Sequence, residues 1–410
     1  MIISKEQIKK QGNIQLPSSK SISNRVLIIQ KLCDAKFEIE NLSQANDTQE
    51  LQLALSSVHA ASSEKNRNEA AKTEIYTGEG GTTFRFLTAY LSTQEGEWIL
   101  RCSPSMIRRP VGDLVEALNN IGAEIDYLEN IGFPPLKIKG RKMNGGKIPL
   151  YASVSSQFVS ALCMIAPTLT HGLQIHLDGK IASSSYIRMT LSLMEYFGVK
   201  LSWKNEVIEI LPQKYIPRDI VIETDWSAAA PFYQIACFTE STDLFISGLY
   251  QESLQGDSCL PEIFNELGVK TTFSENGIQL GHQAIDARSF EYDFTDCPDL
   301  VQPVAVTCAA QNIYARLKGV HNLPFKETNR IQALQNELKK FGVNVTYQND
   351  QIKIQGEFDR KENVLINDYN DHRMVMSFVP LAVVCDSVEI ENPEAVKKSF
   401  PDFFNQLLLT

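Results

Sequence analysis

At 410 residues the chain is longer than one hydrophobic core usually covers, so we expect two domains of about 200 residues each. Its formal charge of −10 argues against nucleic acid or an anionic membrane as the main partner, because both partners need a basic face. Cations that hold an anionic ligand must therefore be gathered locally.

The cysteines and the N-terminus indicate the cellular compartment. The eight cysteines are scattered, mostly within apolar runs such as 161–165, and no CxxC pair suggests zinc or a redox motif. Residues 1–6 lack the apolar stretch of a signal peptide, and no apolar run approaches the roughly 18 residues of a membrane span. We therefore expect a soluble protein of the reducing cytoplasm.

The first polar segment with an unusual composition is 17–25, which is rich in serine and contains Lys20 and Arg25. It precedes the apolar run 26–29, so its hydroxyls and cations are expected around a helix N-terminus, where backbone N–H groups bind phosphate or carboxylate. The alternative is a serine-rich cap with solvated charges. A nucleotide P-loop is not expected, since its glycine-lysine pattern is missing.

The glycine-rich segment 77–85 predicts a strand-to-helix joint, where Gly81 would let a ligand approach the backbone. A purely structural turn explains the same pattern equally well. Further along, Arg109 is a candidate for bidentate binding of a carboxylate or phosphate. The planar guanidinium of arginine suits this geometry better than the ammonium group of lysine.

One unit recurs along the chain: an amphipathic helix, a glycine, a strand, a short turn and a second strand. Its glycines are Gly122, Gly198, Gly268 and Gly342, each placed where a helix C-terminus favours positive φ. Two copies fall in each half of the chain, which predicts two similar domains of repeated βαβαββ-like units. A domain change is expected near 223–227.

Two helix starts between these glycines carry small hydroxyls. They are Ser155-Ser156-Gln157 and the segment from Ser183 to Tyr186. Each alone is typical of an ordinary N-cap, but several in one domain resemble a cradle for a phosphate and a polyol.

The second half contains the carboxylates best suited to proton transfer, Asp299 and Glu327. Glu327 stands with Lys326 and Arg330 in what we predict to be one helical turn, an arrangement that stability alone does not favour. The structural alternatives are an N-cap for Asp299 and an intrahelical ion pair for Glu327. Near the C-terminus, Arg373 and Lys398 supply two further cations, and Asp371 and His372 are expected to orient Arg373 rather than to react.

Several short motifs occur in one order from residue 20 to residue 402. They are Lys20-Ser21-x-Ser23-Asn24-Arg25, Gly81-Thr82 with Arg85, Arg109-Pro110, Ser155-Ser156-Gln157-Phe158, Lys326-Glu327-Thr328 with Arg330, Asn370-Asp371-His372-Arg373-Met374, and Lys398-Ser399-Phe400-Pro401-Asp402. Together they resemble the 5-enolpyruvylshikimate-3-phosphate (EPSP) synthase family of the shikimate pathway, and the resemblance covers the whole chain.

The resemblance implies a two-domain α/β (α+β) protein with an inverse α/β barrel-like fold. Each domain would contain three βαβαββ repeats, and the active site would lie in the cleft between the domains. Residues 17–225 would form the N-terminal domain, on the shikimate-3-phosphate side. Residues 1–16 and 226–410 would form the C-terminal domain, on the phosphoenolpyruvate and catalytic side.

The implied reaction belongs to the biosynthesis of chorismate and the aromatic amino acids. The 5-hydroxyl of shikimate-3-phosphate adds to C2 of phosphoenolpyruvate while C3 is protonated, and phosphate then leaves. The resemblance implies no metal and no organic cofactor, two small-molecule substrates as the partners, no nucleic acid, no membrane and a monomeric enzyme.

The resemblance also implies a role for individual residues. Those implied for shikimate-3-phosphate are Lys20, Ser21, Arg25, Ser155, Ser156, Gln157, Ser183, Tyr186, Asp299, Asn322 and Lys326. Those implied for phosphoenolpyruvate are Lys20, Gly81, Arg109, Gln157, Arg330, Arg373 and Lys398. Those implied for catalysis are Lys20, Asp299, Lys326 and Glu327, with Asp299 or Lys326 relaying the hydroxyl proton and Glu327 acting at the methylene carbon.

Three positions depart from the family pattern: Glu79 replaces a frequent Asn, Phe86 a frequent Pro, and Asn329 a frequent Asp. Glu79 would place a negative charge beside the anion pocket. The nearest alternative function is UDP-N-acetylglucosamine enolpyruvyl transfer, but Pro104 stands where that enzyme typically has a reactive cysteine. A non-catalytic anion-binding protein would not need the carboxylates Asp299 and Glu327.

Overall fold

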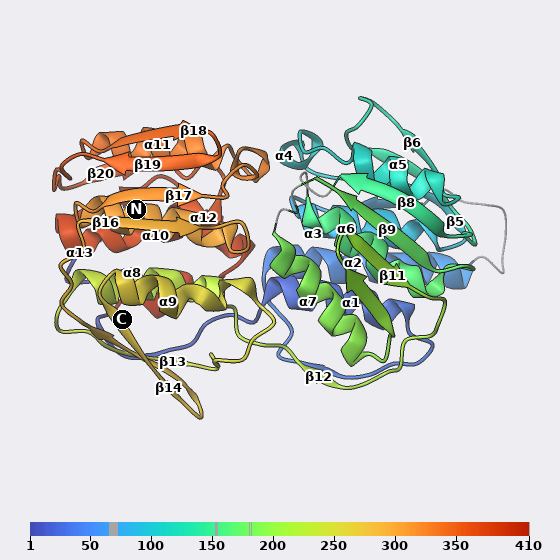
Figure 1. Ribbon diagram of the computed structural model, residues 1–410, viewed down its shortest axis with the longest axis horizontal. Helices are drawn as coiled ribbons and strands as arrows, with labels where there is room; N and C mark the ends of the chain where they lie inside the picture. The colour runs from blue at the N-terminus through green and yellow to red at the C-terminus, as the bar shows by residue number, and fades with distance from the viewer. Residues whose placement is uncertain (65–72, 152–154, 180, 182, 410) are drawn as a thin grey trace. The chain divides into compact units, whose positions relative to one another are not determined.

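The computed structural model describes residues 1–64, 73–151, 155–179, 181 and 183–409, and this part of the chain forms two compact units. Unit 1 joins Met1–Ser19 to Glu223–Thr410, and unit 2 is Lys20–Ile222. Figure 1 shows helices and sheets interleaved within each unit, which confirms the mixed α/β class expected from the sequence. In the described residues, no helix combines the length and apolarity that a membrane crossing requires.

The described part of unit 2 contains three sheets, two of them four-stranded with the same topology. In both, the first strand pairs in parallel with the second, and the second and third strands pair antiparallel with the fourth. Their strands are β4 (Thr73–Tyr76), β5 (Gly96–Arg101), β6 (Glu124–Tyr127) and β7 (Leu136–Gly140), then β8 (Gly146–Tyr151), β9 (Leu173–Asp178), β10 (Leu201–Lys204) and β11 (Val207–Ile210). The third sheet pairs β3 (Ile39–Glu40) with β12 (Ile220–Val221).

Helices alternate with these strands, as a βαβαββ repeat requires. The helices of unit 2 are α1 (Lys20–Leu32), α2 (Asn46–Glu64), α3 (Gly81–Ser92), α4 (Pro104–Ile107), α5 (Gly112–Asn120), α6 (Ser156–Ile165) and α7 (Ser184–Tyr196).

Unit 1 repeats the same topology in two of the three sheets of its described part. One sheet consists of β16 (Ser289–Asp293), β17 (Tyr314–Lys318), β18 (Asn344–Gln348) and β19 (Gln351–Gln355); the other consists of β2 (Gln11–Ile14), β13 (Asp243–Ser247), β14 (Val269–Ser274) and β15 (Gly277–His282). Strands β2 and β13 are parallel neighbours in this sheet, and the whole of unit 2 lies between them in the sequence. The third sheet consists of β1 (Ile2–Ser4), β20 (Val364–Ile366) and β21 (Ser387–Ile390).

The helices of unit 1 follow the same alternation with its strands. They are α8 (Ala230–Phe238), α9 (Leu260–Glu266), α10 (Val301–Ala310), α11 (Arg330–Lys340), α12 (His372–Phe378), α13 (Ala382–Cys385) and α14 (Phe403–Leu407). Single 3₁₀ turns precede several of them, including η2 (Trp226–Ala229), η3 (Gly256–Cys259), η4 (Pro298–Leu300) and η5 (Leu323–Phe325).

The four repeat glycines end their helices as predicted. Gly122, Gly198, Gly268 and Gly342 have φ of 106°, 82°, 95° and 78°. Each lies two residues after the last helical residue of α5, α7, α9 or α11 and is followed by an antiparallel strand pair. The predicted repeat is therefore confirmed, because glycine reaches this left-handed backbone without strain.

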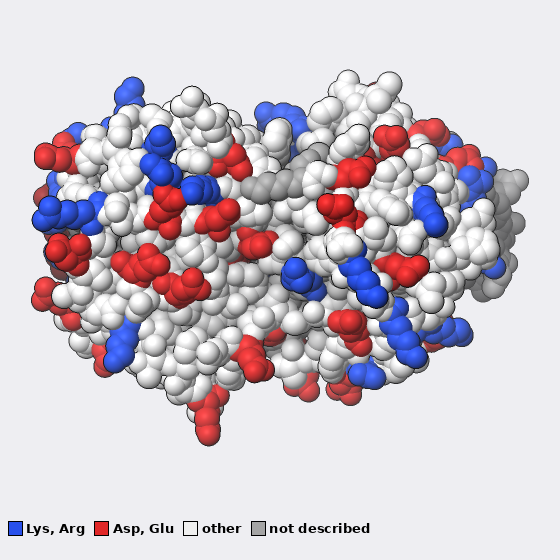
Figure 2. All heavy atoms as spheres, in the orientation of Figure 1, with Lys and Arg blue, Asp and Glu red and all other residues white. Residues whose placement is uncertain are grey.

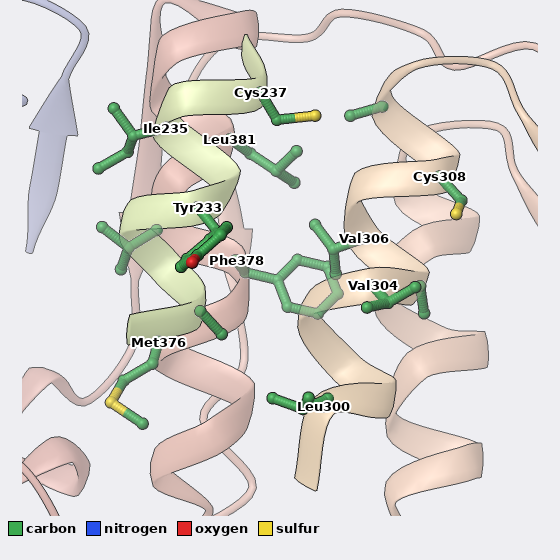
Figure 3. Close-up of a cluster of buried hydrophobic side chains, with 14 of the residues drawn as sticks. Tyr233, Ile235, Cys237, Leu300, Val304, Val306, Cys308, Met376, Phe378 and Leu381 are labelled. Carbon is green, nitrogen blue, oxygen red and sulfur yellow. The ribbon is translucent and has the colours of Figure 1, made fainter. Parts of the chain in front are cut away.

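Each unit has its own hydrophobic core, and the inner helices of unit 1 are buried all round. Figure 3 shows side chains from α8, α10 and α12, among them Tyr233, Val306 and Phe378, packed together. Every residue of α10 is buried. The polar groups Ser227, Asp299 and Asp371 lie just before α8, α10 and α12, so the chemistry of unit 1 is concentrated at helix N-termini.

Candidate active site

Arg330 lies at the centre of a charged cluster in unit 1. Its side chain is 1% exposed and contacts three carboxylates. Nε donates to Asp371 Oδ2 at 2.8 Å, Nη1 to Asp299 Oδ1 at 2.9 Å, and Nη2 to Glu327 Oε2 at 3.1 Å. The carboxylates of Asp299 and Glu327 are therefore held against one guanidinium, although they are 28 residues apart in sequence.

Three more cations complete this cluster. Arg373 Nη2 donates to Asp299 Oδ2 at 2.7 Å, and Lys326 Nζ lies 3.7 Å from Asp299 Oδ1. Lys398 Nζ lies 3.6 Å from Glu327 Oε1. The structure thus brings together six of the site residues expected in this unit, and the seventh, Asn322, is buried just before η5.

The segment around Lys326 corrects one prediction. Lys326 and Glu327 do not lie in a helical turn; α11 begins at Arg330, and the residues before it form a bend. Asn329 is the N-cap, since its side chain accepts from Gln332 N at 3.1 Å. This departure from the family pattern therefore keeps a capping function, and the bend turns Glu327 back onto Arg330.

Burial and charge shift the titration of this cluster. Burial alone would lower the pKa of Arg330, but Asp371, Glu327 and Asp299 together outweigh it and raise that pKa. Burial opposes ionisation of Asp299, yet Arg373, Lys326 and Arg330 hold its pKa well below the usual range. Burial lowers the pKa of Lys326 despite the opposing charge of Asp299. The proton of Lys326 is thus held less tightly than that of an exposed lysine.

Sequence reasoning missed Asp257, Ser227 and the role of Asp371. Asp371 was expected to orient Arg373; its carboxylate instead binds Arg330, and it caps α12 by accepting from Arg373 N at 3.0 Å. Its place in the motif with Arg373 was the available signal. Asp257 in η3 is buried, and burial together with the charge of Asp299 raises its pKa to about 7. No pattern in the sequence pointed to it.

Among the described cations of unit 2, Arg25 is the most deeply buried, at 2% exposed. Its donors meet neutral oxygens: Thr190 Oγ1 at 2.7 Å, the Ser21 carbonyl at 2.7 Å, Ser160 Oγ at 3.3 Å and the Tyr186 carbonyl at 3.2 Å. Among the described residues, no carboxylate forms an ion pair with it. Burial lowers its pKa to about 10.

Two aromatic rings flank the Arg25 guanidinium. Its Cζ lies 5.4 Å from the centre of the Phe86 ring and 5.9 Å from that of Tyr186. Phe86 is itself buried, so this departure from the family's Pro supplies a ring for a cation–π contact. Glu79, the other departure in this unit, is exposed.

Gly81 and Arg109 are brought into contact, as an anion site would require. A Cβ atom added to Gly81 would lie 2.6 Å from Arg109 Nη1, so any larger residue would force this guanidinium to shift. Beside them, Gln157 Oε1 accepts from Arg85 Nη1 at 2.5 Å, and Gln157 Nε2 donates to Thr82 Oγ1 at 2.9 Å. The amide of Gln157 therefore has one defined orientation.

The remaining site residues of unit 2 lie at helix starts. Helix α1 begins at Lys20, so Lys20 and Arg25 lie within it rather than before it, which corrects the prediction. Lys20 Nζ is 2.9 Å from Asp47 Oδ2. Ser155 caps α6, with Ser156 as the first helical residue, and Ser183 precedes α7 with a φ of 57°.

The charges of the site are not part of a broad basic surface. On the face drawn in Figure 2, acidic and basic side chains are intermingled over both units. Among the described residues, no cluster of three or more His, Cys, Asp or Glu side chains is arranged to hold a metal ion. The arrangement suits anionic substrates and proton transfer.

Comparison with known proteins decides the family. The model of the family EPSP synthase (3-phosphoshikimate 1-carboxyvinyltransferase) matches residues 5–407. The chain belongs to the EPSP synthase family. A 3-phosphoshikimate 1-carboxyvinyltransferase of Bacteroides fragilis (strain YCH46) is 42% identical over 405 residues, which cover 98% of this chain and 95% of that protein. One of Shewanella halifaxensis is 32% identical over 418 residues, covering 98% and 97%.

A solved structure supports the EPSP synthase fold. The 2.37 Å structure of EPSP synthase from Acinetobacter baumannii superposes with a TM-score of 0.77 over 99% of this chain and 96% of that one, at 20% sequence identity. The two-domain α/β fold implied by the motifs is therefore confirmed.

Proposed function

We propose that this chain transfers the enolpyruvyl group of phosphoenolpyruvate to the 5-hydroxyl of shikimate-3-phosphate, releasing phosphate. The observation that carries the proposal is the full-length match to a family named for this reaction. The charged cluster of unit 1 supports it, because addition to the enol phosphate carbon of phosphoenolpyruvate needs both proton transfer and local neutralisation of anions.

We assign the anionic groups of phosphoenolpyruvate to the cations of both units. In unit 1 these are Arg330, Arg373 and Lys398; in unit 2, Lys20, Gly81, Arg109 and Gln157 supply a cationic and amide surface. Cations held in place before the reaction stabilise charge that develops on the transferring group, which is usually the largest catalytic contribution.

The proton steps are divided between three groups of unit 1. Glu327 protonates C3 of phosphoenolpyruvate and takes the proton back when phosphate leaves; its contacts with Arg330 and Lys398 fix the position of this carboxyl group. The lowered pKa of Lys326 favours Lys326 as the group that receives the proton of the attacking hydroxyl. Asp299, whose pKa is held low, is a weak base and instead holds Lys326 in place by charge.

Shikimate-3-phosphate is assigned mainly to hydroxyl-rich helix starts. Ser155, Ser156 and Ser183 would receive its phosphate, since small hydroxyls and backbone N–H groups at helix N-termini suit that anion. Arg25 offers a buried positive charge balanced by no carboxylate of the described residues. The other groups proposed for this substrate are Lys20, Ser21, Gln157, Tyr186, Asp299, Asn322 and Lys326.

The proposal extends to the cellular compartment and the oligomeric state. We propose a monomer of the cytoplasm that uses small-molecule substrates only. All eight cysteines are free thiols, which supports a reducing compartment.

The test is phosphate release from phosphoenolpyruvate with two acceptors compared. We expect turnover with shikimate-3-phosphate and none with UDP-N-acetylglucosamine. Turnover only with the nucleotide sugar would make the chain the sister enolpyruvyl transferase. Binding of both shikimate-3-phosphate and phosphoenolpyruvate without phosphate release would make it a non-catalytic anion-binding protein.

A further inference from the structure

A hydroxyl that sequence reasoning did not select lies against Arg373. Ser227, in η2 of unit 1, is 6% exposed. Arg373 Nη2 donates to Ser227 Oγ at 3.1 Å and to Asp299 Oδ2 at 2.7 Å. These two acceptors share the same terminal nitrogen, and together they fix the orientation of the Arg373 guanidinium.

The Ser227 hydroxyl is itself oriented. Its single proton is donated to Asp225 Oδ1 at 2.6 Å, so its lone pairs are left to accept from Arg373. Asp225 also accepts from Ser227 N at 2.9 Å and caps the start of η2. A carboxylate thus orients a hydroxyl, and the hydroxyl holds a cation.

The segment with Asp225 and Ser227 is anchored from a second side. Gln255 Oε1 accepts from Trp226 N at 3.1 Å, and Gln255 Nε2 donates to the Thr224 carbonyl at 2.8 Å. The backbone of the serine is therefore held on both sides of Asp225. Such support is needed to keep a hydroxyl aimed to within a few tenths of an ångström.

We infer that Ser227 is a positioning residue for Arg373 and sets how well this cation receives the anionic part of phosphoenolpyruvate. The inference rests on the proposed function, in which Arg373 binds that substrate. Arginine has several rotatable bonds, so an unanchored guanidinium loses entropy when it grips an anion. Anchoring by Ser227 removes part of that loss before the substrate arrives.

The decisive variant is Ser227→Ala, which removes the hydroxyl and keeps the Asp225 cap on the backbone. We expect the KM for phosphoenolpyruvate to rise about 5- to 15-fold, which is near the upper end for the loss of one typical hydrogen bond, because Ser227 acts on the substrate only through Arg373. The kcat and the KM for shikimate-3-phosphate should stay within twofold of the wild type. Ser227→Thr keeps the hydroxyl and should restore most of the affinity.

A matched control is Ser387→Ala in β21. Ser387 is 9% exposed, accepts from Asn363 N at 3.1 Å and donates to Asn363 Oδ1 at 3.0 Å, so it also makes one hydrogen bond of each kind. Both alanine variants should lose a similar amount of thermal stability. Only Ser227→Ala should change the KM for phosphoenolpyruvate.

The outcomes separate the inference from the proposed function. An inactive but folded wild-type protein would contradict the proposed function. With an active wild type, an unchanged KM for phosphoenolpyruvate in Ser227→Ala would overturn the positioning role. An equal loss for both substrates, not rescued by Ser227→Thr, would show that Ser227 only supports the fold.

Discussion

Arg330 of unit 1 and Arg25 of unit 2 are almost equally buried, but their surroundings are opposite. Arg330 contacts three carboxylates, and their charge raises its pKa in spite of burial. Arg25 contacts neutral oxygens and two aromatic rings, and burial lowers its pKa to about 10. Burying a charge without a counter-charge is unfavourable, so the second arrangement needs another reason.

The difference indicates two kinds of task. Around Arg330 three carboxylates of the protein meet the positive charges, so the carboxylates of Glu327 and Asp299 are held in defined places before any substrate binds. Around Arg25 a positive charge is left for an anion, since no carboxylate among the described residues forms an ion pair with it. We interpret unit 1 as the part that moves protons and unit 2 as the part that mainly holds the acceptor substrate.

Glu327→Gln gives the largest expected effect and tests the role of unit 1. Gln keeps the shape and can still accept from Arg330, but it cannot transfer the proton to C3. We expect kcat to fall about 10²- to 10⁴-fold, with both KM values within threefold of the wild type. Steady-state kinetics measure this; wild-type turnover would remove Glu327 from the mechanism.

Asp371→Asn tests the balance of charge around Arg330. Arg330 keeps Asp299 and Glu327, but the buried cluster loses one negative charge and gains an excess of positive charge, so we expect the free energy of unfolding to fall by about 3–5 kcal/mol. Thr190→Val removes a neutral partner of Arg25 and should cost roughly 1.5–3 kcal/mol. Urea unfolding of both variants gives the comparison, and a larger loss for Thr190→Val would reverse our interpretation.

Asp257→Asn tests the carboxyl group beside the cluster whose pKa is raised to about 7. The unfolded chain releases this proton near pH 4 and the folded chain only near pH 7, so the folded state binds more protons between these values. Wild-type stability should therefore fall as pH rises from 5 to 8, by roughly 2–3 kcal/mol more than that of the variant. Parallel stability profiles from denaturant unfolding would show that Asp257 is charged throughout.

Phe86→Leu gives the smallest expected effect and tests the aromatic surroundings of Arg25. Loss of a cation–π contact worth about 1 kcal/mol should raise the KM for shikimate-3-phosphate about fivefold. Phe84→Leu is the matched control, because Phe84 is equally buried on the same helix, α3. If both variants raise this KM equally, the effect comes from a disturbed core and not from the ring beside Arg25.

Much of the fold could be predicted because its signals are local. A glycine just after a helix, as at Gly198 or Gly342, allows the left-handed backbone with positive φ that ends the helix, and this requirement does not depend on distant residues. The motifs then identified the family, and the same residues proved to lie together: Asp299 with Lys326, Arg330 and Arg373 in unit 1, and Gly81 with Arg109 in unit 2.

What could not be predicted depends on contacts between distant segments. Asp371 was expected to orient its neighbour Arg373, but its carboxylate binds Arg330, which is 41 residues away. Asp257 and Ser227 carry no local pattern, and only the folded chain places them near Asp299. The helix starts at Lys20 and Arg330 were predicted a few residues away from where they lie. The start at Arg330 depends on capping by Asn329, which is decided by backbone geometry and not by charge.

Equilibrium binding of shikimate-3-phosphate to two variants tests the division between the units most directly. Isothermal titration calorimetry would compare wild type, Glu327→Gln and Arg25→Met, after thermal unfolding shows that each is folded. We predict that Glu327→Gln binds with a Kd within twofold of the wild type, while Arg25→Met binds at least tenfold more weakly. A similar loss in both variants, or a larger loss in Glu327→Gln, would contradict the account.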